Sequence, residues 1–348
     1  MTGDLLTRRG PARAGTARPG RRSTMLGLGV GIAALAALIG VRSITAGWDD
    51  LSLPEALRDF VTLATSVIIE SLPFVFLGVL LSVIVQIWVP DRVIHRLLPR
   101  NRTARRAVLS LLGVLLPVCE CGNVPLARGL VIKGVGVPEA ATFLLAAPIL
   151  NPVTIITTYQ AFGWSDGILA GRIVGGFVIA NLVGWLFSRH PEPERLLTPE
   201  FSASCQVHRD HPVSGRRMRR AVAGFAEETA TMLPALVIGS MIAGAIQVGV
   251  SRDLLGALGA NPIWSVLALM GLAFIVAICS NVDAFFILAF GATFTPGSIV
   301  AFLVFGAMVD VKMIAMMRTT FTTRALVVLV SVVALTTLVL GFGVNLLV

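Results

Sequence analysis

Residues 115–154 read LLPVCECGNVPLARGLVIKGVGVPEAATFLLAAPILNPVT, a stretch that places two thiols, the carboxylate between them and two amides inside largely apolar sequence. The residues concerned are Cys119, Glu120, Cys121, Asn123 and Asn151. A similar pattern returns in the second half of the chain, where Cys279 follows Cys119 by 160 residues and Asn281 follows Asn123 by 158. We therefore predict that the chain consists of two diverged copies of one unit.

Composition indicates a polytopic, all-α membrane protein. Of 348 residues, 55% are hydrophobic and 14% charged, the mean hydropathy is +0.86, and apolar runs repeatedly reach the roughly 20 residues that span a bilayer. The net charge of +9 does not indicate nucleic-acid binding, because the arginines cluster in short segments between apolar runs. The four cysteines form no disulfide framework of the secreted kind.

The arginine distribution predicts the topology in an inner (cell) membrane. Residues 91–106 hold six arginines and residues 188–220 hold seven, so both segments and the N-terminus are expected in the cytoplasm. The predicted organisation is a disordered basic tail (1–24), an extra transmembrane helix (25–46), permease repeat 1 (60–187), a cytoplasmic linker (188–220) and permease repeat 2 (221–348).

Parity decides how the first copy crosses the membrane. Two cytoplasmic segments enclose four apolar ones, Ala107–Val118, Val124–Lys133, Val137–Gln160 and Asp166–Phe187. If the last two each cross once, the first two form a hairpin, either of two short helices or of two full crossings. In the second copy, Pro262–Ile278 and Ala284–Thr293 form a hairpin entered from the outside. The copies are then an inverted repeat, as in many secondary transporters.

Hairpin ends and broken helices predict where a site lies. Asn123 and Asn281 each precede an apolar helix and are expected to be N-caps. The third element of each copy is expected to break near mid-membrane, at Pro148 and Asn151-Pro152 in the first copy and near Gly306, Asp310 and Lys312 in the second. Irregular backbone at that depth is tolerated where protein or a water-filled cavity surrounds it, so we predict a binding site there.

Charged residues at mid-membrane cost about 2.5–3.5 kcal/mol each on insertion scales. We therefore assign Asp283, Asp310 and Lys312 to ion coupling and Glu120 to solute binding. Asp310 and Lys312 are two residues apart and cannot face each other on a regular helix, so each is expected to have its partner elsewhere. Glu70 either joins the coupling group or belongs to a buried polar network.

The thiols have two interpretations. Thiolates prefer soft, thiophilic partners, whereas small buried cysteines also serve tight packing. A structural zinc ion is not expected, because Cys119 and Cys121 have only Cys279 as a further intramembrane thiol, and no cofactor is predicted. The tract that contains Cys205, His208 and His211 resembles a metal-binding sequence in the cytoplasmic linker.

Four blocks of this chain resemble a known family: PVCECGNVP, GVGVPEAATFLLAAPILNPVT, CSNVDAFF and GAMVDVKM. Together they are similar to the YraQ/ArsP-type predicted permeases, from about Phe60 to Val348. The resemblance implies a multi-spanning inner-membrane permease, and some members of the family export trivalent organoarsenicals. The cysteine block of the family corresponds to Cys119 and Cys121, with Glu120 where many relatives have Ser.

These observations favour a secondary-transport permease that exports a small thiophilic solute by ion-coupled alternating access. The solute-binding residues are then Cys119, Glu120, Cys121, Asn123, Asn151, Cys279 and Asn281, and the coupling residues are Glu70, Asp283, Asp310 and Lys312. A phosphate-binding GxxxxGK[ST] loop is absent from the sequence, so ATP-driven pumping by this chain is not indicated.

Two alternatives remain open at this point. The chain could be a channel, or a membrane subunit of a larger export complex for another ion or anion, with a homo-oligomer or a partner subunit. It could also be an intramembrane thiol redox protein. All four histidines fall in polar segments, which disfavours the redox protein, and no enzymatic activity is predicted.

Overall fold

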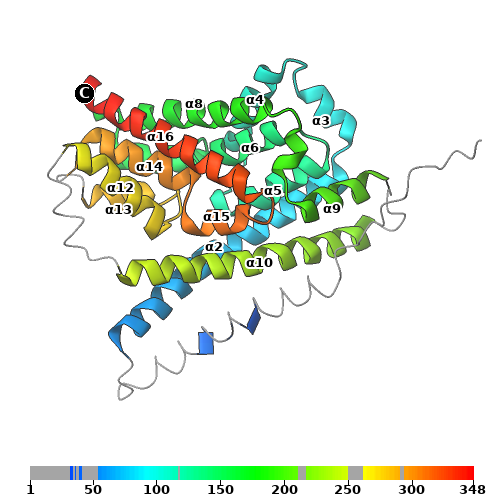
Figure 1. The fold of residues 1–348 in the computed structure, drawn as a ribbon, viewed down its shortest axis with the longest axis horizontal. Helices are drawn as coiled ribbons and strands as arrows, with labels where there is room; N and C mark the ends of the chain where they lie inside the picture. Colours follow the sequence, from blue (N-terminus) through cyan, green and yellow to red (C-terminus); the bar gives the residue numbers. More distant parts are fainter. Residues whose placement is uncertain are drawn as a thin grey trace, which may run out of the picture.

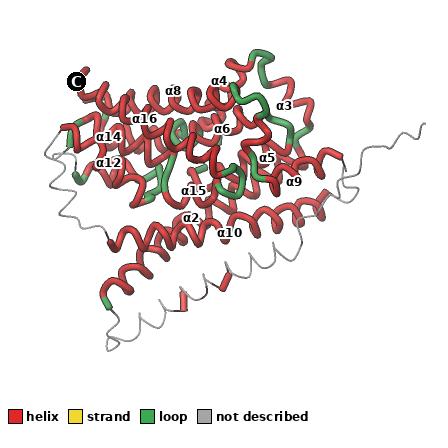
Figure 2. Tube along the Cα trace, viewed as in Figure 1, coloured by secondary structure: helices red, strands yellow, loops and turns green. Residues whose placement is uncertain are grey.

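The computed structural model describes residues 54–116, 118–210, 217–249, 262–290 and 294–348, together with five positions between Ile32 and Gly40. The secondary structure in this part of the chain is helical, with one isolated bridge between Leu197 and Phe321 (Figure 2). The all-α prediction is confirmed. The predicted basic tail and most of the extra N-terminal helix lie outside the described residues.

The described helices fall into two halves (Figure 1), and apart from α3 each helix of the first half has a counterpart in the same order among the described helices of the second. The first half contains α2 (Glu55–Trp88), α3 (Asp91–Leu97), α4 (Arg102–Leu111), α5 (Glu120–Ile132), α6 (Val137–Ala146), α7 (Pro152–Phe162) and α8 (Ile168–Ser188). After α9 (Pro199–Asp210), the second half contains α10 (Arg217–Gly249), α12 (Pro262–Val276), α13 (Asp283–Leu288), α14 (Pro296–Met308), α15 (Val311–Met317) and α16 (Thr323–Leu347).

Equivalent helices of the two halves that touch run antiparallel. Along α2 and α10, Ala64 lies beside Gly244 and Val83 beside Gly224. Along α8 and α16, the neighbours are Gly171 with Val344, and Gly175 with Leu340. Such pairs are what an inverted repeat requires, although the orientation of each half in a membrane stays a prediction.

In the part of the chain that the structure describes, six helical segments are long and apolar enough to cross a membrane, three in each half. They are Glu55–Trp88, Val137–Phe162, Ile168–Ser188, Arg217–Gly249, Pro296–Met317 and Thr323–Leu347. The second and fifth consist of two helices each, α6 with α7 and α14 with α15. The chain therefore has the helices of a multi-pass membrane protein.

The predicted hairpins are too short to cross. We call residues 102–132 (α4 and α5) hairpin 1, and residues 262–288 (α12 and α13) hairpin 2. The 13 residues of α5 extend about 20 Å at 1.5 Å per residue, whereas the hydrocarbon core is about 30 Å thick. Of the two arrangements left open by parity, this length favours the re-entrant one, in which each hairpin would enter and leave on the same side; the arrangement in the membrane stays a prediction.

The arginine-rich segments lie at one end of the molecule. The backbone N–H of Thr322, at the start of α16, donates to the carbonyl oxygen of Leu196 in the linker (2.9 Å). Arg106, at the start of hairpin 1, reaches Gly184 near the end of α8. At the opposite end, Gly167 before α8 meets the C-terminal Val348. The segments that the sequence predicts to share the cytoplasmic side are thus neighbours.

Close backbone contact fixes the first turn of α5 against α2. A Cβ atom added at Gly78 would overlap the backbone of Gly122, so only glycine permits this approach. One turn further along each helix, the hydroxyl group of Ser82 donates to the carbonyl oxygen of Pro125 (2.7 Å). This contact holds the end of hairpin 1 in the interior of the protein.

Candidate functional site

The two hairpin ends meet at the centre of the molecule, but their helices do not begin where the sequence predicted. Cys119, and not Asn123, occupies the N-cap position of α5, and Asn123 lies inside the helix. Asn281 caps nothing either, because Val282 is the N-cap residue of α13 and the Asn281 side chain accepts a hydrogen bond from Thr154 (3.1 Å). Both N-cap predictions were wrong. In hairpin 1, contact with α2 stabilises a helix that begins four residues earlier.

The predicted breaks in the third elements are confirmed. In the first half, α6 ends at Ala146 and α7 begins at Pro152. Asn151 caps α7 by accepting from the N–H of Val153 (2.9 Å) and also donates to the carbonyl oxygen of Val118 in hairpin 1 (3.1 Å). In the second half, Asp310 caps α15 by accepting from the N–H of Met313 (2.6 Å). Both breaks border the hairpin ends.

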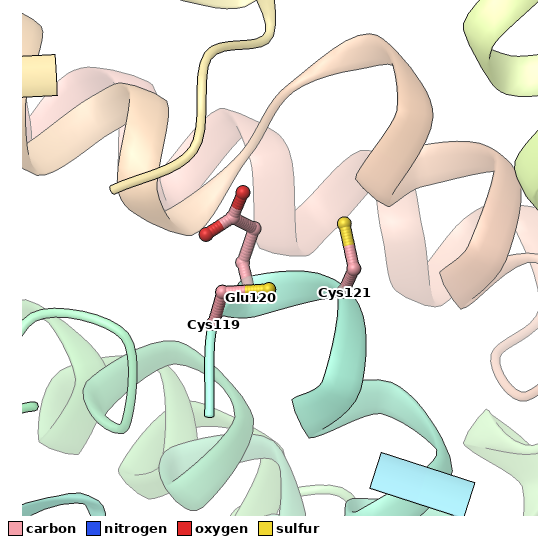
Figure 3. A group of neighbouring side chains, drawn as sticks. All are labelled: Cys119, Glu120 and Cys121. Carbon is pink, nitrogen blue, oxygen red and sulfur yellow. The ribbon is translucent and has the colours of Figure 1, made fainter. Parts of the chain in front are cut away.

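Glu120 joins the two halves. Its Oε2 accepts hydrogen bonds from the hydroxyl (2.9 Å) and the backbone N–H (3.3 Å) of Ser280 in hairpin 2. Its Oε1 lies 3.2 Å from the ammonium nitrogen of Lys312. The carboxylate is buried, with 1% of the residue exposed, and it projects from the first turn of α5 (Figure 3). A charge in this position requires the partners that the second half supplies.

Lys312 is buried completely at the start of α15. Besides Glu120, its Nζ donates to the carbonyl oxygen of Ala277 (2.8 Å), and it lies 3.9 Å from Oδ2 of Asp310. The nearest carboxylate to Lys312 is therefore that of Glu120, which agrees with the prediction that Lys312 has its partner elsewhere. For Asp310 the prediction was wrong, because the ion pair of Asp310 is with Lys312 itself.

Three buried thiols surround Glu120. The ligand atoms of Cys119, Glu120 and Cys121 lie within 4.8 Å of one another (Figure 3). From hairpin 2, the thiol of Cys279 lies 3.9 Å from Oε2 of Glu120 and within hydrogen-bonding reach of the Cys119 thiol. All three cysteines are free of disulfide bonds. The arrangement presents soft sulfur ligands from both halves to one point.

Cys119, Glu120 and Cys121 could in principle hold a metal ion, since thiolates and a carboxylate are common zinc ligands. Lys312 argues against a resident divalent ion. Its ammonium group already pairs with Glu120 at 3.2 Å, and its positive charge would repel a cation at that carboxylate. The donor set fits a soft solute that binds through sulfur better than a structural metal.

Glu70 lies at the edge of this cluster, in the middle of α2. Its carboxylate is within hydrogen-bonding reach of the backbone N–H of Cys279 and is close to the charges of Lys312 and Glu120. Unlike these two, Glu70 is exposed. Of the two roles left open for Glu70, the structure therefore favours membership of the site.

Arg172 is a site residue that the sequence analysis missed. It lies in α8 with 1% exposure, and its guanidinium group binds both carboxylate oxygens of Asp283 (2.9 and 2.6 Å). It also donates to the hydroxyl of Thr158 (2.8 Å) and to the carbonyl oxygen of Ser280 (3.3 Å). The signal was present, because an arginine within an apolar span is as costly as the acids that were singled out.

A second buried ion pair that the sequence analysis missed lies at the end of the molecule that carries the arginine-rich segments. Arg128 in α5 pairs with Glu228 in α10 (2.6 Å) and donates to the carbonyl oxygen of Thr319 (2.9 Å). Its guanidinium group lies over the ring of Phe201 in α9, 4.1 Å from the centroid. We call Arg128, Glu228, Thr319 and Phe201 the Arg128 cluster.

The possible metal tract of the linker is described only in part. Cys205 lies in α9 with 6% exposure and packs in the main core. The side chain of His208 and the whole of His211 are outside the described residues. Metal binding by this tract stays a hypothesis.

Two short hairpins and two broken helices around a polar centre are typical of membrane permeases. The family described as "Predicted permease" matches residues 56–346, and the chain belongs to this ArsP-type family. The chain is 38% identical to the UPF0718 protein YcgR of Bacillus subtilis, over 76% of this chain and 90% of that protein. It is 32% identical to a putative two-component membrane permease complex subunit of Streptococcus mutans, over 78% and 90%.

A more distant relative is the UPF0718 protein YraQ of Escherichia coli, which is 24% identical over 76% of this chain and 75% of that protein. No solved structure matches the chain. The family resemblance deduced from the sequence blocks is thereby confirmed.

Proposed function

We propose that this protein is a secondary transporter that exports a small thiophilic solute, of the trivalent organoarsenical type, by ion-coupled alternating access. The observation that carries the proposal is the convergence of Cys119, Cys121 and Cys279 beside Glu120, where the two hairpins meet. Soft centres prefer thiolate to carboxylate or carbonyl ligands. A binding role explains why three thiols and a carboxylate occur together in the membrane interior.

The proposed chemistry is ligand exchange without oxidation or reduction. A trivalent centre arrives bound to cytosolic thiols, and each cysteine that forms a bond to it displaces one of them. The proton of the cysteine thiol leaves with the displaced thiol. Glu120 is the carboxylate nearest to the thiols and could relay this proton. One or two exchangeable As–S bonds hold the solute without a closed cage, so release on the other side requires only the reverse exchange.

Coupling is proposed to involve Glu120 and Lys312, with Glu70 and Asp310 beside them. A proton or a solute that neutralises Glu120 would remove the main partner of the Lys312 ammonium group and leave Asp310 as the next carboxylate, at 3.9 Å. The same event would weaken the contact of Glu120 with Ser280, which joins the hairpins. Asp283 is a poor proton carrier in this scheme, because Arg172 occupies both of its oxygens.

The test is uptake of phenylarsine oxide into inverted membrane vesicles, with and without an imposed pH gradient. We expect uptake by the parent that depends on the gradient, and at least about tenfold less by a Cys119→Ser/Cys121→Ser variant, because oxygen is a hard ligand. Cys205→Ser is the matched control, since Cys205 lies in α9 outside the site. Protein levels in the membrane are measured for each variant. Equal uptake by the parent and the double variant would refute a role of these thiols in binding.

The second candidate is a membrane subunit of a larger export complex, or a channel, for another ion or anion. It is favoured by the name of the Streptococcus mutans relative, a putative two-component membrane permease complex subunit. The chain also has an apolar groove of about 660 Å³ between α2 and α10, lined by Leu80, Ile84, Trp88, Met218 and Val222 among others. Purified protein that transports alone in liposomes would exclude the need for a second subunit.

A further inference from the structure

Asn123 is a buried polar residue whose amide is unpaired. None of its surface is exposed, and neither its amide nitrogen nor its amide oxygen has a hydrogen-bond partner among the residues that the structure describes. Leaving a buried polar group unsatisfied costs about 1–3 kcal/mol. The helix does not need the amide, since the N-cap residue of α5 is Cys119. An amide that costs stability at this position points to a partner that binds there.

The position of Asn123 indicates what that partner touches. Residues three and four apart share one face of a helix, so Asn123 lies on the face of α5 that carries Glu120 and Cys119. This is the face directed at Ser280 and Lys312 of the second half. One oxygen of Asp310 also lacks a hydrogen bond in this region. Unsatisfied polar atoms and soft thiol ligands therefore occur in the same site.

We propose that Asn123 is a specificity-determining residue that binds a hydroxyl group on the transported solute. The inference rests on the proposed function and narrows the solute class. An amide offers an acceptor and two donors, which match a hydroxyl group that both donates and accepts. The preferred solute then has a thiophilic centre that keeps a hydroxyl group after binding to sulfur. A bare soft cation has no group that could form a hydrogen bond with Asn123.

Arsenite, As(OH)3, is the simplest probe of this class. When two cysteine thiols bind it, two As–S bonds form, two As–O bonds break, and two hydroxyl groups leave as water with the thiol protons. The oxidation state of arsenic does not change, and the third hydroxyl group remains for Asn123. Methylmercury is the contrasting probe, because it binds a thiol and carries no hydroxyl group once bound.

The experiment uses the full chain in lipid nanodiscs, with thermal unfolding and probe affinity measured for the parent and for Asn123→Leu. Without a probe, we expect the variant to unfold at the same or a higher temperature, because an unsatisfied amide is replaced by an apolar group of similar size. Its affinity for arsenite should fall about tenfold or more, and its affinity for methylmercury should be unchanged. A structural residue would not give this combination.

Asn181→Leu is the matched control. The amide of Asn181 donates to the hydroxyl of Ser110 (3.0 Å) and to a carbonyl oxygen of its own helix, so this variant should lose stability without a change in probe preference. If Asn123→Leu does not fold, Asn123→Ala and Asn123→Ser replace it, and only the serine variant, which keeps a donor and an acceptor, should retain preference for arsenite.

Three results would overturn the inference in different ways. Lower stability of Asn123→Leu without a probe would show that the amide has a structural partner such as an ordered water molecule. An equal loss of arsenite and methylmercury affinity would show that Asn123 supports the cysteines rather than the hydroxyl group. Failure of the parent to bind arsenite would refute this inference, and the proposed function would fall with it only if the parent also failed to bind methylmercury and to take up phenylarsine oxide.

Discussion

Breaking the pair of Arg172 and Asp283 should destabilise the protein strongly, whereas replacing both partners should not. Removing one member of a buried ion pair typically costs 3–5 kcal/mol, because the other charge is left without compensation. Asp283→Asn keeps the shape of the side chain and one acceptor oxygen but removes the negative charge, so the guanidinium group of Arg172 keeps only neutral partners such as Thr158 and the carbonyl oxygen of Ser280. We expect a loss of about 3 kcal/mol or more in the free energy of unfolding.

The double variant Arg172→Met/Asp283→Leu should recover most of that loss, because an apolar pair of similar volume removes both buried charges. The assay is unfolding of the purified protein by sodium dodecyl sulfate in mixed micelles, followed by tryptophan fluorescence. Arg195→Met is the control, because its pair with Glu192 is exposed and should contribute less than about 1 kcal/mol.

Two results would refute this reasoning about the pair. One is a loss below about 1 kcal/mol for Asp283→Asn, which would mean that the carboxylate is not charged in the folded protein. The other is a double variant as unstable as the single one, which would mean that both side chains fill space that Met and Leu cannot. If a folded Asp283→Asn variant kept pH-gradient-driven transport at the parent rate, Asp283 would also be excluded as the proton carrier.

Two further predictions concern access to the site and topology. Arg128→Met removes the guanidinium group that joins α5 to Glu228, Thr319 and Phe201. The test uses a variant in which Cys121 is the only cysteine. In inverted vesicles, a membrane-impermeant thiol reagent should label Cys121 several-fold faster when Arg128→Met is added to this variant. Unchanged labelling would show that the Arg128 cluster does not limit access of the reagent to Cys121. In a cysteine-free background, Gln206→Cys should react in inverted vesicles and not in intact cells, because Gln206 is exposed on α9. Labelling in intact cells would contradict the predicted topology.

Native Cys205 is an unsuitable probe of that topology, although its place in the linker suggests it. Sequence polarity predicted an accessible segment there, but residues 199–210 form α9. Helix α9 packs on α5, and Cys205 lies in the core with 6% exposure. A helix that covers the end of a membrane protein is polar on one side only, so polarity averaged over the segment does not show which residue faces inward.

The elements of the fold could be predicted because their causes are local. Proline after Asn151 ends a helix wherever the chain goes, and apolar runs of fixed length predict spans. The start of α5 could not be predicted by the same rules. Those rules place Pro125 in a first turn and Asn123 at the cap, whereas the contact of Gly122 with Gly78, 44 residues earlier in the chain, extends the helix back to Glu120.

The partners in the site were beyond sequence reasoning because they are distant in the chain. Glu120 was identified as a costly charge, but its contacts are with Ser280 and Lys312, in the other half. No local pattern shows which of several buried charges will meet. Arg172 and Arg128, by contrast, could have been identified from the sequence. Each is a charged residue in an apolar segment, and the cost argument used for the acids applies equally to them.

The two halves share their helices but divide the chemistry of the site between them. Hairpin 1 supplies two thiols and the Glu120 carboxylate, and the second half supplies Lys312, Ser280 and the third thiol. Hydrogen bonds to a charged group contribute about 1.5–3 kcal/mol each, so Glu120 holds the hairpins together as long as it is charged and free of solute. A rocking motion of one half against the other must break these bonds. In the proposed mechanism, a solute or a proton that neutralises Glu120 would lower that barrier, and movement of the halves would be conditional on occupancy of the site, as the proposed coupled transport requires.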